Sequence, residues 1–299
     1  MTWSLVAGKD FEDSIRSRMV WAAVGIFVLL MAIVGLSASL GDLSDSSPMD
    51  IIVMFTNIGG ELLVPIIALM VGYMAIVGER QSGSLRILFG LTHNRRDVFV
   101  GKLVSRIGVI LFATLIACAA AVTLALGLFG TLPVASFLGF IAITLLLGAA
   151  FTAIAVGISA MTESRMAAMG GAIGSYVLFV MLWHPLVAGI YYAVNGKLAG
   201  LEAPAWYFFL LRLNPLQLYA ETASSISDQF IYGLFGWQGT VENIPKSAMQ
   251  DTSKLMLSNR LGGHVPFYLS DWFAPVILLL WIVVPAVIGY RTFQRADLN

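Results

Sequence analysis

Residues 62–77 read LLVPIIALMVGYMAIV, and residues 78–86, which follow directly, read GERQSGSLR. The first stretch is apolar enough for a membrane, whereas the second contains a carboxylate and two arginines. A further apolar run begins at Ile107, so residues 78–106 form a cation-rich segment between two membrane-length runs. In a membrane protein such a segment typically lies on the cytoplasmic side. The function of the protein depends on which molecule binds this segment.

The composition indicates an integral membrane protein. Hydrophobic residues make up 59% of the 299 residues and charged residues 11%, with a mean hydropathy of +0.87. These values lie far from the averages of soluble domains. Seventeen basic and seventeen acidic residues cancel, so no overall field indicates nucleic acid as a partner. The single cysteine, Cys118, excludes an intramolecular disulfide framework and a cysteine-based zinc cluster.

The predicted fold class is an all-α integral membrane protein with six transmembrane helices. A spanning helix needs roughly 20 mostly apolar residues to cross a bilayer. Six stretches meet this requirement, and their approximate bounds are Met19–Leu40, Leu62–Val77, Ile107–Gly130, Val134–Met161, Met169–Val194 and Phe273–Tyr290. The first is expected to be an uncleaved anchor, because it is longer than the apolar part of a signal peptide.

The distribution of basic residues predicts the orientation. Twelve of the seventeen lie on one side of the predicted topology: Lys9, Arg16, Arg18, Arg80, Arg86, Arg95, Arg96, Lys102, Arg106, Arg165, Arg291 and Arg295. The positive-inside rule assigns this side to the cytoplasm. We therefore expect a multi-pass protein of the plasma membrane with both termini in the cytoplasm.

Two further segments are expected to lie at the membrane surface. In residues 1–18, apolar residues recur every four positions, which is typical of an amphipathic interfacial helix; they are Trp3, Ala7, Phe11 and Ile15. Residues 203–220 are apolar but contain Arg212, whose burial in a spanning helix is costly, so they predict re-entrant or interfacial helices. The polar stretch up to Asp271 predicts an external cap, with a disordered insert as the alternative.

These features divide the chain into four parts. Residues 1–18 are the interfacial helix, and residues 19–194 hold spans one to five with the cytoplasmic segment 78–106. Residues 195–271 form the external loop with the re-entrant helices, and residues 272–299 hold span six and the tail.

Motifs that would indicate nucleotide binding, catalysis or metal binding are absent or weak in this sequence. The sequence has no Gly-x-x-x-x-Gly-Lys-Ser/Thr phosphate loop and no His-Glu-x-x-His motif. Ser159 with His184 would form a serine-protease dyad, although small residues within spans usually serve packing. Met70 and Met74, one turn apart, offer thioether ligands for copper, but methionine more often fills gaps in apolar cores.

Two features within the spans have more than one interpretation. Glu61 is a candidate intramembrane carboxylate, either capping the first turn of span two or relaying protons; the first is favoured, because a helix N-terminus stabilises negative charge. Gly170 and Gly174 form a Gly-x-x-x-Gly motif, which allows close helix packing either between subunits or within one.

The cytoplasmic segment can form a short helix capped by Ser82 or Ser84, with Leu85, Leu88 and Phe89 on one apolar edge. A membrane subunit that lacks a nucleotide site but presents such a helix is suited to being moved by a separate motor. An ordinary positive-inside loop would explain the charge equally well, and the pattern alone leaves both open.

The same segment resembles the signature that follows the second span in permease subunits of the type-two ABC exporter family, in particular its NosY-like branch, which is associated with multicopper-enzyme maturation. The matching residues are Gly78, Glu79, Arg80, Ser82, Gly83, Ser84, Leu85, Leu88, Arg95, Gly101 and Lys102. Weaker similarity extends to Lys9-Asp10-Phe11, Leu213-Asn214-Pro215 and Gly289-Tyr290. Thr92 departs from the family, which often has proline there.

The resemblance implies a half-transporter. Two copies would pair as a homodimer in the lipid bilayer, and each would bind an ABC ATPase subunit that carries ATP and magnesium, with no cofactor on this chain. It also implies a coupling helix within residues 79–96; the residues assigned to ATPase coupling are Glu79, Arg80, Ser82, Gly83, Leu85, Arg86, Leu88, Arg95 and Arg96. Gly170 and Gly174 are candidates for the dimer seam.

The predicted function is therefore that of a permease subunit of an ATP-driven exporter for an apolar or amphipathic cargo, without catalysis of its own. Two other classes stay open. A secondary, ion-coupled transporter would need ionisable residues within its spans, for which Glu61 is a poor sole candidate, and an intramembrane enzyme would depend on Ser159.

Overall fold

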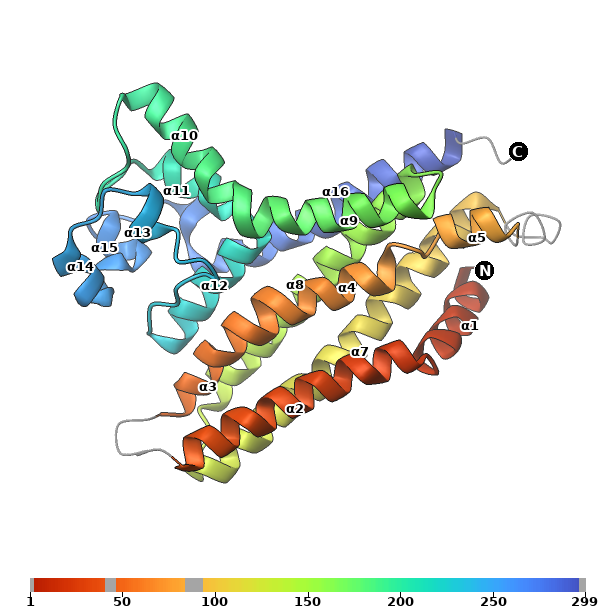
Figure 1. Cartoon of the computed structure of the whole chain (residues 1–299), viewed down its shortest axis with the longest axis horizontal. Helices are drawn as coiled ribbons and strands as arrows, with labels where there is room; N and C mark the ends of the chain where they lie inside the picture. Colours follow the sequence, from red (N-terminus) through yellow and green to blue (C-terminus); the bar gives the residue numbers. More distant parts are fainter. Residues whose placement is uncertain (1–2, 41–46, 84–93, 296–299) are drawn as a thin grey trace.

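The computed structural model describes residues 3–40, 47–83 and 94–295, and this part of the chain is helical without a β-strand. The long helices run side by side as a bundle (Figure 1). One end of the bundle holds α1 (Trp3–Ile15), α5 (Val77–Ser82) and the C-terminal end of α16 (Ala274–Arg295). We call this the basic end, because Arg80, Arg95 and Lys102 lie there.

The opposite end carries several short helices, and we call it the capped end (Figure 1). These short helices are α11 (Ala205–Arg212), α12 (Pro215–Ser227), α13 (Gln238–Val241), α14 (Lys246–Gln250), η3 (Thr252–Leu255), α15 (Leu257–Arg260), η4 (Phe267–Leu269) and η5 (Asp271–Phe273). Residues 203–220, expected to form re-entrant or interfacial helices, thus fold as α11 and the first part of α12.

Five helical stretches in the described residues are long and apolar enough to cross a membrane. They are Pro48–Ser82, Arg95–Phe129, Val134–Met161, Arg165–Asn195 and Asp271–Arg295. The predicted first span coincides with α2 (Arg18–Leu40), which has 23 residues and is not among these five stretches. The structure therefore supports five of the six predicted spans by length and composition.

The second span starts earlier than predicted. Its helix begins at Pro48, as α3 (Pro48–Met54), and not at Leu62. The backbone N–H of Ser47 donates to the carboxylate of Asp50 over 2.7 Å, which closes the first turn. The chain continues through the π-helical segment η1 (Phe55–Leu63) into α4 (Val64–Gly72).

The prediction failed there because polar and glycine residues between Thr56 and Glu61 were interpreted as a loop. In the fold Thr56 is fully buried, and its hydroxyl donates to the Ile52 carbonyl over 2.7 Å. Tyr219 of α12 lies against Gly60 so closely that a Cβ there would come within 2.1 Å of the tyrosine ring. Tertiary packing therefore makes this stretch part of the helix.

The third span is also longer than predicted, because α7 (Arg95–Phe129) begins at the basic residues before Ile107. The side chain of Asn94 caps α7 by accepting a hydrogen bond from the backbone N–H of Asp97 over 2.9 Å. The basic residues of the second half of segment 78–106 therefore extend the helix of the third span.

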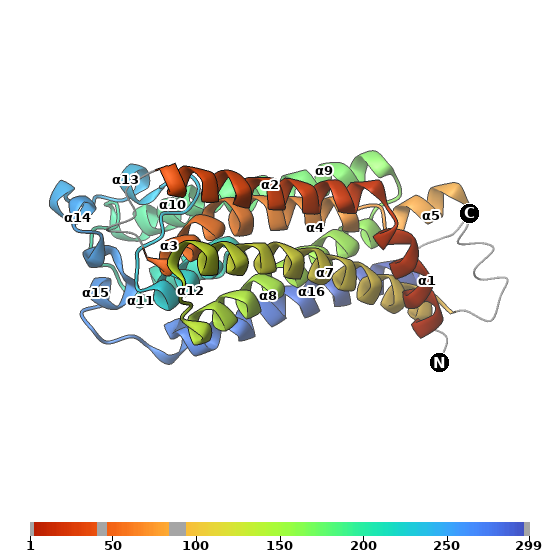
Figure 2. The same ribbon diagram turned by 90° about the horizontal axis from the view of Figure 1, so that it is seen from below.

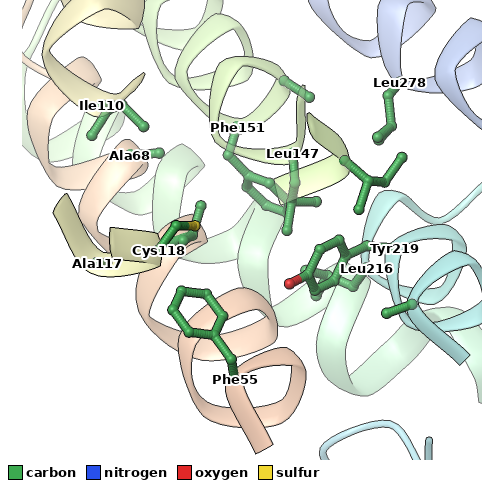
Figure 3. Packing of buried hydrophobic residues seen from close by; sticks show 14 of the residues in the cluster. Phe55, Ala68, Ile110, Ala117, Cys118, Leu147, Phe151, Leu216, Tyr219 and Leu278 are labelled. Atoms are coloured by element: carbon green, nitrogen blue, oxygen red, sulfur yellow. The ribbon is translucent and has the colours of Figure 1, made fainter. Parts of the chain in front are cut away.

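Helix α8 (Val134–Met161) lies at the centre of the bundle. It contacts α4, α7, α12 and α16, and the core around it contains buried side chains from all of them. Figure 3 shows the ring of Tyr219 among Leu147, Phe151 and Leu216. The hydroxyl of Tyr219 lies 3.1 Å from that of Thr144 in α8, so this buried polar group is satisfied.

The crossing of α8 and α16 depends on two glycines. A Cβ on Gly157 would lie 2.7 Å from the carbonyl oxygen of Pro285, and a Cβ on Gly289 would lie 2.7 Å from the Cα of Gly157. The two backbones are therefore in direct contact, as in membrane helix pairs that place small residues at the interface.

Candidate functional site

A group of charges around the buried Lys102 joins three helices at the basic end. The Nζ atom of Lys102 in α7 lies 3.0 Å from Oδ1 of Asp10 in α1 and 2.6 Å from Oε1 of Glu79 in α5. Arg106, one turn further along α7, lies 2.9 Å from the same Asp10 oxygen. We call these four residues the Lys102 cluster. Lys102 is only 2% exposed, whereas the side chains of Asp10, Arg106 and Glu79 are 13%, 21% and 29% exposed, so a buried lysine is paired with partly exposed partners.

The electrostatics of the Lys102 cluster favour the ionised form of the Asp10 carboxyl. Burial alone would raise the pKa of the Asp10 carboxyl, but the charges of Lys102 and Arg106 outweigh it and hold the pKa below its ordinary value. Because the pKa of Asp10 is lowered in the folded state, its ion pairs contribute fully to stability above the unfolded-state pKa. This contribution is lost as the pH falls through the folded-state pKa. The cluster is therefore intact at neutral pH.

Helix α1 lies across the ends of the long helices and packs directly on α7 (Figure 2). Gly101 makes this contact possible, because a Cβ there would lie 2.8 Å from Cβ of Val6 and 2.9 Å from the carbonyl oxygen of Trp3. The adjacent residues Gly101 and Lys102 thus have complementary functions: the glycine admits the backbone of α1, and the lysine binds its carboxylate.

No function was predicted for Asp10. Its position gives a signal that could have revealed one, since Asp10 lies three residues after Ala7 and four before Ser14, and both of these are buried. A carboxylate on the buried face of an amphipathic helix requires a cationic partner. Lys102 and Arg106, four residues apart on a helix, form a suitable pair.

Arg95 connects α7 to the last helix. Its Nη1 atom donates to the carbonyl oxygens of Phe293 and Gln294, over 2.9 and 2.7 Å. Both carbonyls lie in the last turn of α16, where a cation also interacts favourably with the helix dipole. Arg96, by contrast, is exposed.

Arg80 and its neighbours connect α5 to the end of α8. Arg80 lies 3.4 Å from Oε1 of Glu163, and Gln81 donates to the Glu163 carbonyl over 3.3 Å. Gly83 ends α5 in a left-handed conformation, with φ of 76°. The hydroxyl of Ser82 donates to the Glu79 carbonyl over 3.2 Å, so Ser82 belongs to the last turn of α5 and does not begin another helix.

The remaining residues assigned to coupling, Leu85, Arg86 and Leu88, lie outside the described residues, as does the alternative cap Ser84. The structure therefore brings Glu79, Arg80, Ser82 and Gly83 together on α5. It places Arg95 and Arg96 at the start of α7.

Ser159 and His184 do not form a dyad. The hydroxyl oxygen of Ser159 accepts hydrogen bonds from the backbone N–H groups of Ile76 and Val77, both over 3.0 Å, where α4 gives way to α5. Ser159 thus satisfies backbone donors at the basic end. His184 lines cavities at the capped end with Gln217.

Glu61 is buried, with 3% exposure, in the middle of the second span. The prediction that it caps the first turn is wrong, because the helix begins at Pro48. Its carboxylate instead accepts the backbone N–H of Leu234 over 2.7 Å, and its carbonyl accepts the hydroxyl of Tyr176 over 3.0 Å. Glu61 thus connects the second span to the capped end and to α9 (Arg165–Val177).

Gly170 and Gly174 face open space on α9. No described atom of another element lies within 4 Å of a Cβ built on either residue, whereas one on the adjacent Gly171 would lie 2.8 Å from Ile158. Close by, an apolar groove of about 440 Å³ lies between α4 and α9, and Met70 and Met169 line it. The described residues contain no group of three or more His, Cys, Asp or Glu side chains that could hold a metal ion.

A bundle of apolar helices with a basic end defines a multi-pass membrane protein, and comparison with known proteins gives the family. A family model described as ABC-2 family transporter protein matches residues 4–298. A protein of Pseudomonas aeruginosa named "Probable ABC transporter permease protein NosY" is 31% identical over 227 residues, which cover 73% of this chain and 80% of the relative. A protein of the same name from Stutzerimonas stutzeri is 29% identical over 297 residues, or 97% of each chain.

The chain therefore belongs to the ABC-2 transporter family, and it is a membrane permease subunit of an ABC transporter. This confirms the resemblance found in residues 78–102. Permeases of this family are transport subunits and not enzymes, and the ATPase activity lies in the partner subunit.

Proposed function

We propose that the chain is the membrane half of an ATP-driven exporter in the plasma membrane, with six spans and both termini in the cytoplasm. Support for this orientation comes from the basic end, which carries α1 and the arginines around α5 and α7. Positive charge on the cytoplasmic side is the general rule for membrane proteins. ATP and magnesium would bind only to the partner subunit.

One observation carries the coupling part of this proposal. Lys102 connects α1, α5 and α7 through Asp10 and Glu79, at 3.0 and 2.6 Å. Helix α5 leads directly into the segment assigned to ATPase contact. A displacement of that segment would therefore move α5, α1 and the long helix α7 together, and would not be absorbed locally.

ATP binding would close the partner ATPases, and the Lys102 cluster would pass this displacement to the spans. This is a two-state mechanism, in which nucleotide binds one arrangement of the complex more tightly than the other. Arg95 would extend the connection to α16 through its hydrogen bonds at the last turn of that helix.

The proposal also covers how two copies of the chain pair and which kind of cargo they carry. Gly170 and Gly174 are open to another helix from outside the chain, which supports a homodimer that packs through α9. The apolar groove between α4 and α9 is lined by Met70, Tyr73, Met169 and Tyr176. An apolar or amphipathic cargo, such as a lipid, a peptide or a drug, fits walls of this chemistry.

The ATPase contact can be tested by charge reversal. Arg95 has partners within the chain, so the variant of choice is Arg86→Glu with Arg96→Glu, which leaves Arg95 intact. We expect ATPase co-purification to fall at least tenfold, about 1.4 kcal/mol of binding free energy, because like charges would face the partner. The measurement is quantitative pull-down from solubilised membranes.

The matched control reverses exposed cations at the capped end, in the variant Lys197→Glu with Lys246→Glu. This control should retain the ATPase at the wild-type level. Unchanged pull-down of the Arg86 and Arg96 variant would remove the coupling assignment, as would equal loss in both variants.

A further inference from the structure

Glu61 is a buried carboxyl group in the π-helical segment η1 of the second span. The residue is 3% exposed, and its side chain accepts a hydrogen bond from the backbone N–H of Leu234 over 2.7 Å. Glu61 takes part in none of the ion pairs that the described residues form. An ionised carboxylate without a cationic partner is costly to bury, and such a group ordinarily takes up a proton instead.

The carboxyl group of Glu61 lies at the contact between the second span and the capped end. A Cβ built on Gly233 would lie 3.7 Å from Oε1 and 3.9 Å from Oε2 of Glu61, so both oxygens face this part of the capped end. The N–H of Gly236 donates to the carbonyl of Gly233 over 2.8 Å, which closes a tight turn with Leu234 inside it. A change in the charge of Glu61 would therefore act directly on this turn. π-Helical segments such as η1 are rare and occur frequently at functional sites.

A cavity of about 30 Å³ lies beside Glu61 and has room for a water molecule. His184, Asn214 and Gln217 contribute polar side chains to its wall. The amide of Asn214 is already engaged by backbone groups through both its nitrogen and its oxygen. Nε2 of His184, in contrast, is buried and has no hydrogen-bond partner among the described residues. A water molecule in this cavity would accept the proton of the Glu61 carboxyl and donate to Nε2 of His184.

His184 also borders a larger cavity, of about 230 Å³, that extends into the capped end. Both cavities have His184 and Gln217 in their walls. The larger one is also lined by Ser225 and Ser258, which are exposed, so it reaches the surface of the protein. Glu61, His184 and the outer surface therefore follow one another along two adjoining cavities. Chains of carboxyl and imidazole groups are the usual proton relays within membrane spans.

Other titratable groups lie on the elements around Glu61. Within the described residues they are Asp50 of α3, Tyr176 of α9, His184 of α10 (Trp183–Asn195), Tyr219 and Glu221 of α12, and Tyr232 in the loop before α13. Each of these except His184 already has a hydrogen-bond or ion-pair partner. Glu61 and His184 are therefore the pair with capacity left for an exchangeable proton.

We propose that the Glu61 carboxyl is a proton-binding site that exchanges its proton with the capped side of the membrane through His184. On release, the O–H bond of the carboxyl breaks and its proton passes to the bridging water, which gives one of its own protons to Nε2 of His184. The imidazolium then releases a proton to the solvent of the larger cavity. Glu61 is left as a carboxylate at the Leu234 contact, so the site links proton binding to the contact between the second span and the capped end.

The test for the bound proton is infrared difference spectroscopy of the full chain in lipid nanodiscs, which detects the C=O stretching band of a protonated carboxyl group. We expect the wild-type chain to show such a band at neutral pH. Glu61→Gln, which keeps an acceptor for the N–H of Leu234, should lose it. The matched control Glu202→Gln, at an exposed carboxyl of the capped end, should keep it.

The route through His184 is tested by the rate at which this band shifts after transfer to D₂O. His184→Phe should slow the shift at least tenfold, whereas His264→Phe, at an exposed histidine of the capped end, should leave the rate unchanged. The proposal is overturned by a wild-type chain without the band, which needs no variant to fold. A band that persists in Glu61→Gln, or an unchanged rate in His184→Phe, overturns it too. No ATPase takes part, so these results do not depend on the proposed transport function.

Discussion

Lys102→Met should uncouple the transporter and destabilise the chain. The substitution keeps the length of the side chain but leaves Asp10 and Glu79 facing each other with one cation fewer, in a group where Lys102 is 3% and Asp10 13% exposed. Breaking a buried ion pair on one side typically costs about 3–5 kcal/mol. We expect a fall of about 3 kcal/mol in stability and loss of most ATP-driven transport, measured by thermal unfolding and by turnover of the reconstituted complex.

Two further variants separate charge from packing in the Lys102 cluster. Lys102→Arg keeps a cation and should retain most activity. The triple variant Asp10→Asn, Glu79→Gln, Lys102→Met removes all three charges and should recover much of the stability but not the coupling. If Lys102→Met alone unfolds and turns over like the wild-type chain, the cluster does not connect α1, α5 and α7 in the working protein.

Gly157→Leu should disrupt the packing of α8 on α16. Its Cβ would lie 2.7 Å from the carbonyl oxygen of Pro285, which belongs to the backbone and cannot rotate away. Overpacking typically costs about 1–3 kcal/mol, and we expect the upper end of that range because backbone must move. The expected result is a lower thermal midpoint and a smaller yield of monodisperse protein in detergent.

Gly127→Leu is the matched control, because the same substitution is made within a long helix where nothing lies within 4 Å of the new Cβ. This control should be neutral or slightly stabilising, since leucine favours helix more than glycine does. Equal thermal midpoints for the Gly157 and Gly127 variants would show that the crossing of α8 and α16 is not close in the protein.

Much of the bundle could be predicted from the sequence, because uninterrupted apolar runs need no tertiary information. Val134–Met161 is the clearest example, with identical predicted and observed bounds. The start of the second span could not be predicted in the same way. Thr56, Gly60 and Glu61 are typical loop residues. Tyr219 packs on Gly60 and the backbone N–H of Leu234 donates to Glu61, and both partners lie more than 150 residues away in sequence.

The candidate site shows the same division. Arg95 was predicted as a coupling residue, whereas Lys102 was noted only as a cytoplasmic cation that matches the family signature. Its partner Asp10 does not follow from spacing, since it lies 92 positions away. Ser159 was considered for catalysis with His184. Its observed role, accepting hydrogen bonds from the backbone of Ile76 and Val77, could not be predicted because it depends on the break between α4 and α5. The functions of such residues depend on contacts between helices, and these require the fold.

The central claim is that a separate ATPase acts on the basic end through residues 78–96. The most direct measurement is cysteine cross-linking in native membranes, with Cys118→Ser as the background and a short bismaleimide as the reagent. A cysteine at Arg86 should cross-link to the ATPase subunit, with a yield that changes on addition of ATP, whereas a cysteine at Lys246 of the capped end should not. Cross-linking from Lys246 and none from Arg86 would contradict the account.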